Sequence, residues 1–263
     1  MRVTNTPARL LIIAGSDSSA GAGLQADLKT AQSFGVYAQT AITAVTAQDT
    51  NAVHAVHLLP PELVRAQITA ALNDIGADAI KIGMLGSAAI ATAVADALEG
   101  NDLPLVLDPV LLSSSGTMLL DEEGVEILKT RLIPRATLLT PNLPEAEALT
   151  GILPKSDHSL RNAAQAFRIP GAHNILFKGG HGAGNTVRDI LVMGERQSMF
   201  ESPRQQTRHT HGTGCTLATA IACGLALQLS LPDAVAKAHA YVQNALNTAP
   251  GLGSGNGPLN HRA

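Results

Sequence analysis

The residues with the clearest chemical pattern form a glycine turn, Gly212-Thr213-Gly214-Cys215, directly before an apolar, helix-like stretch. Glycines at such a place allow a tight turn and a close approach of the backbone to a ligand. The first N–H groups of a helix have no partner inside it, and the helix dipole favours an anion beside them. The turn therefore indicates a phosphate site. The same residues also fit an ordinary turn beside a buried cysteine. The segment lacks the lysine of a Walker loop, so the motif alone does not decide between the two interpretations.

The two cysteines have different expected roles. Cys215 falls in the first turn of the helix, where the dipole favours the thiolate and lowers the pKa of the thiol. Cys223 lies in the helix interior and is expected to be a small buried hydrophobe. About 12 Å of helix separates them, which is too far for a disulfide. Free thiols without a disulfide framework are typical of a reducing cytoplasm.

A glycine- and serine-rich loop over residues 15–23 joins the first expected strand to the first expected helix. Such a loop can wrap a polar ligand or a phosphate. Asp27 lies four residues into the helix that follows and can take part in binding. A flexible loop beside a solvated aspartate explains the same residues equally well.

Several oxygen-bearing side chains are candidates for holding Mg²⁺, namely Asp108, Asn142, Glu145 and Glu147. Hard oxygen ligands, partly through water, suit a magnesium ion that is bound with phosphates. Glu145 also fits as a first-turn carboxylate favoured by a helix dipole, and Glu147 is expected to be structural. Lys178 ends an apolar strand and can reach phosphate oxygens as a point charge, or it is a lysine in solvent.

Three histidines, His181, His209 and His211, lie in loops near these residues. Their spacing does not resemble a zinc site. We expect structural or solvent-exposed roles for them.

Short apolar runs alternate with helix-like segments along the whole chain. Strands are predicted at residues 10–14, 38–46, 79–82, 105–107, 137–139 and 174–177, followed by a hairpin of 188–193 and 197–201. Helices are predicted at residues 24–34, 61–75, 87–98, 122–131, 144–149, 159–167, 213–229 and 232–248. This alternation predicts an α/β fold of three layers, with a mostly parallel central sheet and helices on both faces.

Polar and glycine residues follow directly after the expected strands. They are Gly15-Ser16-Asp17, Gly83-Met84, Asp108-Pro109, Asn142 and Lys178-Gly179-Gly180. In parallel sheets, ligands bind beyond the carboxyl ends of the strands. We therefore expect these residues to gather at one rim of the sheet.

Composition excludes several classes of function. The 263 residues carry a formal charge of -3, with 2% aromatic residues and no tryptophan, so neither a basic surface nor a stacking platform for nucleic acid is expected. The longest apolar segment, residues 214–229, contains polar residues and is shorter than a membrane span. We expect a single domain over residues 1–263, with flexible ends at 1–9 and 251–263.

Taken together, these blocks resemble the ribokinase-like superfamily, and within it the hydroxymethylpyrimidine/phosphomethylpyrimidine kinases of thiamine biosynthesis. The resemblance runs from about residue 10 to residue 258. It rests on Ala14-Gly15-Ser16-Asp17, Gly21-Ala22-Gly23, Gln25-Ala26-Asp27-Leu28-Lys29-Thr30, Thr43-Ala44-Val45-Thr46-Ala47-Gln48, Lys81-Ile82-Gly83-Met84-Leu85, Leu107-Asp108-Pro109-Val110, Thr140-Pro141-Asn142-Leu143-Pro144-Glu145-Ala146-Glu147, Lys178-Gly179-Gly180-His181 and Thr210-His211-Gly212-Thr213-Gly214-Cys215-Thr216. In order and collinear, these blocks are far more specific than any one alone.

The resemblance implies a ribokinase-like fold, a homodimer and two successive phosphoryl transfers from MgATP. The acceptors would be 4-amino-5-hydroxymethyl-2-methylpyrimidine and then its monophosphate. The residues implied to line the pyrimidine pocket are Gly15, Asp27, Gln48, Met84 and Val110. The Gln48 amide suits an aminopyrimidine edge because it both donates and accepts.

The resemblance also implies roles for the phosphate-handling residues. Lys178 would neutralise phosphate charge together with Thr213 and Gly214 of the turn. Asn142 and Glu145 would position Mg²⁺, with Asp108 nearby. The turn from Gly212 to Cys215 would be the anion hole, and Cys215 the base.

Departures and alternatives bear on the substrate. Ser18 and Ala20 stand where the first loop of the family usually has Pro and Gly, and Ser113-Ser114-Ser115-Gly116 lacks a lysine that some members carry. A pyridoxal kinase on the same scaffold is the main alternative, and Gln48 favours the aminopyrimidine over it. A non-catalytic nucleotide-binding regulator would be expected to lose Cys215, Lys178 or Glu145, and all three are present.

Overall fold

A single twisted sheet of nine strands forms the centre of the protein. The computed structural model describes residues 6–112, 118–181 and 184–262. The strands are β1 (Arg9–Asp17), β2 (Tyr37–Gln48), β3 (Val53–Leu58), β4 (Ala79–Ile82), β5 (Leu105–Leu107), β6 (Leu138–Leu139), β7 (Asn174–Phe177), β8 (Thr186–Met193) and β9 (Arg196–Pro203). Their order across the sheet is β3-β2-β1-β4-β5-β6-β7-β8-β9. The six strands from β2 to β7 in this order are parallel, whereas β3, β8 and β9 join antiparallel at the two edges.

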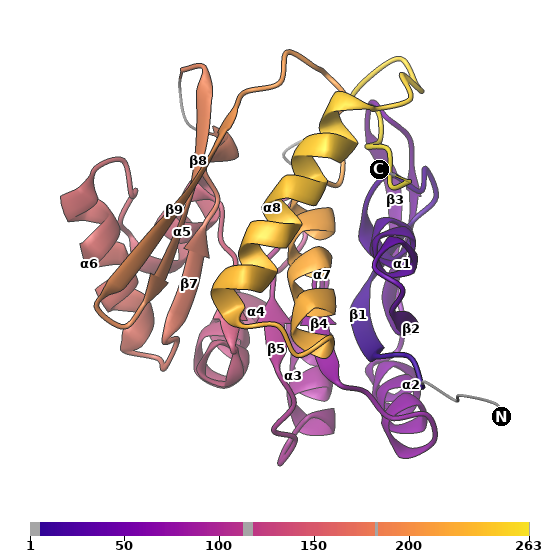
Figure 1. Cartoon of the computed structure of the whole chain (residues 1–263). Helices are drawn as coiled ribbons and strands as arrows, with labels where there is room; N and C mark the ends of the chain where they lie inside the picture. Colours follow the sequence, from indigo (N-terminus) through magenta and orange to yellow (C-terminus); the bar gives the residue numbers. More distant parts are fainter. Residues whose placement is uncertain (1–5, 113–117, 182–183, 263) are drawn as a thin grey trace, which may run out of the picture.

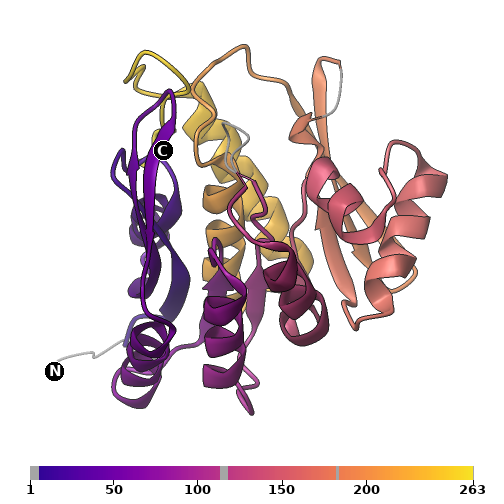
Figure 2. The same cartoon turned by 180° about the vertical axis from the view of Figure 1, so that it is seen from behind.

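Helices cover both faces of this sheet, as Figures 1 and 2 show from opposite sides. They are α1 (Gly23–Ser33), α2 (Pro61–Asn73), α3 (Ala88–Ala97), α4 (Glu122–Ile127), α5 (Leu143–Thr150), α6 (Asp157–Arg168), α7 (Thr213–Ala226) and α8 (Leu231–Asn247). One core lies between the sheet and α1, α7 and α8, and a second lies under α2 to α6. The prediction of a three-layer α/β fold with a mostly parallel sheet is confirmed.

The inner strands alternate their side chains between these two cores. Leu11 and Ile13 of β1 enter the core under α2 and α3, whereas Leu10 and Ile12 enter the core under α7 and α8, and all four are fully buried. A strand buried on both faces reads as a continuous apolar run, which is why the sequence predicts β1. The helix starts also follow from sequence, since Ser87 caps α3 by accepting a hydrogen bond from the Ile90 N–H.

Two segments differ from the sequence prediction. The sequence does not predict β3, because most of its side chains are exposed and apolar and polar residues do not alternate along it. Residues 251–262, expected to be flexible, pack against the protein: Leu259 is buried, and the Asn256 N–H donates to the carbonyl oxygen of Thr50 at 2.8 Å. In Figure 1 this yellow segment lies beside the upper end of β3. At the other end, Arg9 already belongs to β1.

Residues 1–5, 113–117, 182–183 and 263 lie outside the described part of the chain, and with them the serine block at 113–116. Within the described ranges, no helix combines the length and the apolar character needed to cross a membrane.

Candidate active site

The polar residues that follow the parallel strands meet at the carboxyl rim of the sheet, as the sequence predicts. Asp17 ends β1, and Asp108 follows β5 directly. Asn142 follows β6, and Lys178 follows β7; the two residues form an isolated parallel bridge that extends the pairing of these strands. The segment before α7 reaches the same rim, because Gly214 lies against Lys178 and Asp108.

The glycine turn before α7 has the geometry expected of an anion site. Gly212 is the N-cap residue with φ +82°, and a Cβ there would collide with the carbonyl oxygen of Gly21. Only glycine fits this combination of backbone angle and space. The Thr213 hydroxyl donates to the Thr210 carbonyl oxygen at 2.7 Å and holds the turn. A Cβ on Gly214 would lie 3.3 Å from the Lys178 Nζ, so the first turn of α7 faces this ammonium group.

Lys178 sits between two carboxylates. Its Nζ donates to Asp108 Oδ1 at 2.6 Å and lies 3.7 Å from Glu145 Oε2. Burial alone would lower the pKa of Lys178, but the charges of Asp108 and Glu145 outweigh burial and raise it. Burial raises the pKa of Glu145 to about 7, with Lys178 opposing and Asp108 adding to the rise. The rim thus holds a permanent cation beside a carboxyl group that titrates near neutral pH.

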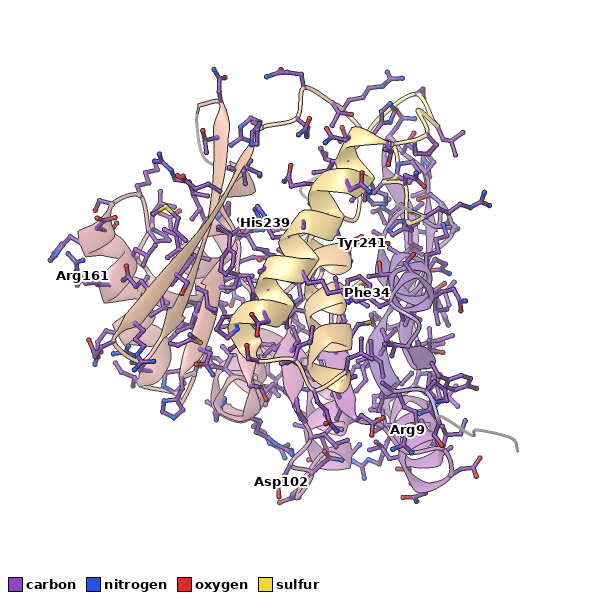
Figure 3. The ribbon with its side chains drawn as sticks, in the orientation of Figure 1. Arg9, Phe34, Asp102, Arg161, His239 and Tyr241 are labelled. Carbon is purple, nitrogen blue, oxygen red and sulfur yellow. The ribbon has the colours of Figure 1, made fainter. Side chains whose placement is uncertain are left out.

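The turn after Lys178 is held by Asp189 of β8, beside His239 of α8. The Gly179 N–H donates to Asp189 Oδ1 at 2.8 Å, and His239 Nε2 lies 3.8 Å from Asp189 Oδ2. Figure 3 labels His239 on α8, on the side that faces β8 and β9. The same helix is held against α1 by an edge-to-face contact of the Phe34 and Tyr241 rings at 5.1 Å.

The expected magnesium residues fit an ion that arrives with phosphates. Asn142 and Glu145 form a capping box, in which Asn142 Oδ1 accepts the Glu145 N–H and Glu145 Oε2 accepts the Asn142 N–H, both at 2.8 Å. Asn142 Oδ1 and Glu145 Oε2 are both engaged in this cap, so Glu145 Oε1 and Asp108 Oδ2 are the more available donors. Among the described residues, no group of three or more His, Cys, Asp and Glu side chains is arranged as a metal cage. Magnesium bound with phosphates and water needs only one or two carboxylates.

Cys215 differs from its predicted electrostatics. The residue keeps some exposed surface, but the burial of its thiol raises the pKa to about 11, although the Lys81 charge and a hydrogen bond from the Gly23 N–H both lower it. The sequence predicts the opposite direction, because the helix dipole is visible in a sequence and the burial of the sulfur is not. The thiol therefore keeps its proton at neutral pH in this structure. Cys223 is fully buried, as predicted.

A buried ion pair lies behind Cys215. Lys81 Nζ donates to Asp27 Oδ2 at 2.6 Å, and both side chains have no exposed surface. Thr219 of α7 donates to the other oxygen, Asp27 Oδ1, at 2.7 Å. Asp27, predicted to line the substrate pocket, is therefore sealed beneath it with both oxygens bonded to protein. Lys81 was not predicted to have a role, although a lysine inside the apolar strand β4 is a sign of a buried partner.

The other predicted pocket residues lie along the rims of β1, β2, β4 and β5. A Cβ on Gly15 would lie 2.9 Å from Met84 Sδ, so these two residues are in contact. The Val110 N–H donates to the Asp108 carbonyl oxygen at 2.9 Å, which places Val110 just beyond Asp108. Gln48, at the end of β2, is partly exposed and has its amide 3.1 Å from His211 Nε2.

Of the two roles predicted for His211, structural or solvent-exposed, the structure agrees with the structural one. The residue is buried, with its Nε2 2.9 Å from Asp17 Oδ2. These residues are 194 positions apart, so no local pattern could have paired them.

Comparisons with known proteins match this chain over most of its length. The model of a family described as phosphomethylpyrimidine kinase matches residues 17–260. A hydroxymethylpyrimidine/phosphomethylpyrimidine kinase from Streptomyces coelicolor is 47% identical over 256 residues, 97% of this chain and 95% of the relative. A Bacillus subtilis pyridoxal kinase solved as an ADP complex has a TM-score of 0.89 at 35% identity and covers 98% of each chain. A phosphomethylpyrimidine kinase from Clostridium difficile has a TM-score of 0.81 at 39% identity, over 91% of this chain and 99% of that structure.

Proposed function

Because the chain belongs to the phosphomethylpyrimidine kinase family, we infer that it carries out two ATP-dependent phosphoryl transfers in thiamine diphosphate biosynthesis. The first acceptor is the hydroxymethyl group of 4-amino-5-hydroxymethyl-2-methylpyrimidine, and the second is the monophosphate that results. The observation that carries this proposal is the meeting of the Gly212–Cys215 turn with Lys178 and Asp108 at the rim. A helix start, an ammonium group and carboxylates within contact of one another are the parts that a phosphoryl group requires.

Phosphoryl transfer depends mainly on position and on stabilisation of charge. The N–H groups of the first turn of α7 would hold the equatorial oxygens, and Lys178 would neutralise the charge that moves to the leaving group. Asp108 and Glu145 would hold Mg²⁺, which supplies further charge neutralisation on the phosphates when bound. Glu145 holds less negative charge below about pH 7, so its contribution to metal binding falls there.

Cys215 remains our candidate for the base at the reacting hydroxyl. A thiol whose pKa is raised to about 11 must first lose its own proton before it can take the proton of the substrate. Transfer through a loose transition state places little demand on a base until late in the reaction. Only the thiolate fraction of Cys215 can accept the substrate proton, so this role requires a turnover that rises with pH until the thiol is ionised.

A coupled assay of ATP consumption tests the function directly. The wild-type protein should consume ATP with the hydroxymethylpyrimidine and with its monophosphate, and less efficiently with pyridoxal, the substrate of the structural neighbour from Bacillus subtilis. A protein that uses pyridoxal best would contradict the assignment.

The Gln48→Ala variant tests the pocket within the same assay. It should raise KM for the pyrimidine more than KM for ATP, because the amide is expected to contact only the pyrimidine. Gln39→Ala is the matched control, because Gln39 lies at the amino end of the same strand and donates to the Gly76 carbonyl oxygen at 2.6 Å. If Gln48→Ala raised KM for the pyrimidine and KM for ATP equally, the assignment of Gln48 to the pyrimidine pocket would be wrong.

Two further expectations stay predictions. A homodimer would cover apolar side chains exposed on the β2–β3 ribbon, namely Val45, Val56 and Leu58, and analytical ultracentrifugation measures its mass. A cytoplasmic location follows from the free thiols of Cys215 and Cys223.

A further inference from the structure

A buried carboxylate at the end of β1 collects hydrogen bonds from one loop and one distant side chain. Asp17 accepts from the N–H groups of Ser19 and Ala22 at 2.8 Å and of Gly21 at 3.2 Å. His211 Nε2 lies 2.9 Å from the same carboxylate. Burial alone would raise the pKa of Asp17, but the bonds from His211, Ser19 and Ala22 together lower it. Asp17 is therefore ionised at neutral pH and can only accept hydrogen bonds.

The tautomer of His211 follows from this acceptor. A ring nitrogen at 2.9 Å from a carboxylate oxygen carries a hydrogen, whether the imidazole is neutral or charged. The ring has little freedom to move, because a Cβ on Gly21 would lie 2.5 Å from its Cδ2. The N–H of His211 thus points permanently toward Asp17 and its surroundings.

The orientation of the Gln48 amide follows from His211. The structure places the amide nitrogen of Gln48 3.1 Å from His211 Nε2, and the amide oxygen accepts from Thr46 Oγ1 at 3.4 Å. A rotation of 180° exchanges the amide oxygen and nitrogen, and hydrogen bonding decides between the two orientations. His211 Nε2 carries a single hydrogen, which Asp17 accepts at 2.9 Å. An amide oxygen beside it is a second, weaker acceptor of that hydrogen, whereas an amide nitrogen brings N–H donors together and is disfavoured, so we infer the exchanged orientation.

The other end of the amide agrees with this orientation. Thr46 Oγ1 donates its hydrogen to the Ser16 carbonyl oxygen at 3.0 Å, which leaves its lone pairs to accept from the Gln48 NH₂ group. The backbone of Gln48 is held as well, because Ser18 Oγ accepts its N–H and donates to its carbonyl oxygen, both at 2.8 Å. One hydrogen of the NH₂ group serves Thr46, and the second can reach a ligand.

We propose that His211, held by Asp17, is a positioning residue that turns the Gln48 amide so that its NH₂ group faces the pocket. The site then selects a substrate ring whose edge offers a hydrogen-bond acceptor, such as a pyrimidine ring nitrogen. This inference rests on the proposed function for its substrate, but the orientation itself does not depend on activity. Because Gly212 follows His211 directly, the same short segment sets both the pocket and the anion turn.

Kinetics of three variants test the role of His211. His211→Ala should raise KM for the pyrimidine about tenfold, the scale of one specified hydrogen bond, and leave KM for ATP within about twofold. His211→Gln should recover more of the lost affinity than His211→Asn, because the glutamine amide nitrogen reaches the position of Nε2. His158→Ala is the matched control: it removes a histidine whose Nε2 lies 3.2 Å from the amide of Asn162 on exposed helix α6.

Nuclear magnetic resonance of the wild-type protein tests the His211 tautomer, the premise of the orientation, without turnover. The ¹⁵N shift of His211, assigned by the signal that disappears in His211→Gln, should be that of a protonated Nε2. An unprotonated Nε2 would overturn the proposal, and so would equal changes of both KM values in His211→Ala, or better rescue by Asn than by Gln. If the wild-type protein fails to phosphorylate the pyrimidine, the proposed function fails, while the ¹⁵N shift still decides the His211 tautomer on which the orientation depends.

Discussion

Replacing Glu145 with glutamine should stabilise the protein, and increasingly so as the pH rises. Folding raises the pKa of Glu145 from its usual 4.5 to about 7, chiefly because the carboxyl group is buried. The protonated form therefore favours the folded state. This contribution is complete below about pH 4.5 and is lost as the pH rises through about 7. A glutamine does not titrate and keeps a constant free energy across this range.

The size of the effect follows from the two pKa values. At 1.36 kcal/mol for each pH unit, the full difference is about 3 kcal/mol, of which about 2.5 kcal/mol falls between pH 5 and pH 8. Lys178 is not stranded by the change, because its 2.6 Å bond to Asp108 remains. The free energy of unfolding of Glu145→Gln, relative to wild type, should therefore increase by about this amount from pH 5 to pH 8.

Urea unfolding followed by circular dichroism at the two pH values measures this difference. Glu147→Gln is the control, since Glu147 is exposed on the same helix and the same charge is removed. Glu145→Gln should also lose activity, as expected when a destabilising charge is kept for function. A difference in unfolding free energy between Glu145→Gln and wild type that is equal at both pH values, or smaller at pH 8, would refute the reasoning.

Two further changes test the buried groups. Iodoacetamide should label Cys215 at a rate that rises about tenfold per pH unit between pH 8 and pH 10, as for a thiol whose pKa is raised to about 11. A labelling rate that is constant from pH 7 to pH 9 would show instead that the thiol has a low pKa. Cys215→Ala should retain ATP binding and lose most turnover, and turnover like that of wild type would remove Cys215 as base. Lys81→Met should cost about 3–5 kcal/mol of unfolding free energy, because it leaves Asp27 buried without its partner. Adding Asp27→Leu should recover most of this loss; a single variant that loses less than about 1 kcal/mol would contradict the importance of the pair.

The sequence predicts the layers and the rim because both follow from local patterns. Apolar runs of four or five residues, such as that ending at Ala14, mark the inner strands, and parallel strands bring their carboxyl ends together wherever they lie in the chain. Asp108 and Lys178 are therefore found at the same place without knowledge of the order of the strands. The exposed strand β3 lacks such a pattern and is missed.

What the sequence does not predict depends on pairings between distant residues. The partners Lys81 and Asp27 are 54 positions apart, and a lysine in an apolar strand does not identify its carboxylate. His211 and Asp17 are further apart still. The raised pKa of Cys215 depends on how much protein surrounds the sulfur, which only the packed structure gives.

The place of α7 in the chain has a consequence for synthesis on the ribosome. α7 packs against β1, β4 and β5, which precede it by more than a hundred residues. The apolar side chains of β4 and β5 on this face, including Ala79 and Val106, therefore stay uncovered until α7 has emerged, whereas β1 is already covered by α1. Nascent chains of this protein are a natural client for chaperones that shield apolar surface. The Gly212–Cys215 turn forms in the same late event, so a chain that ends before α7 is aggregation-prone and lacks the proposed anion site.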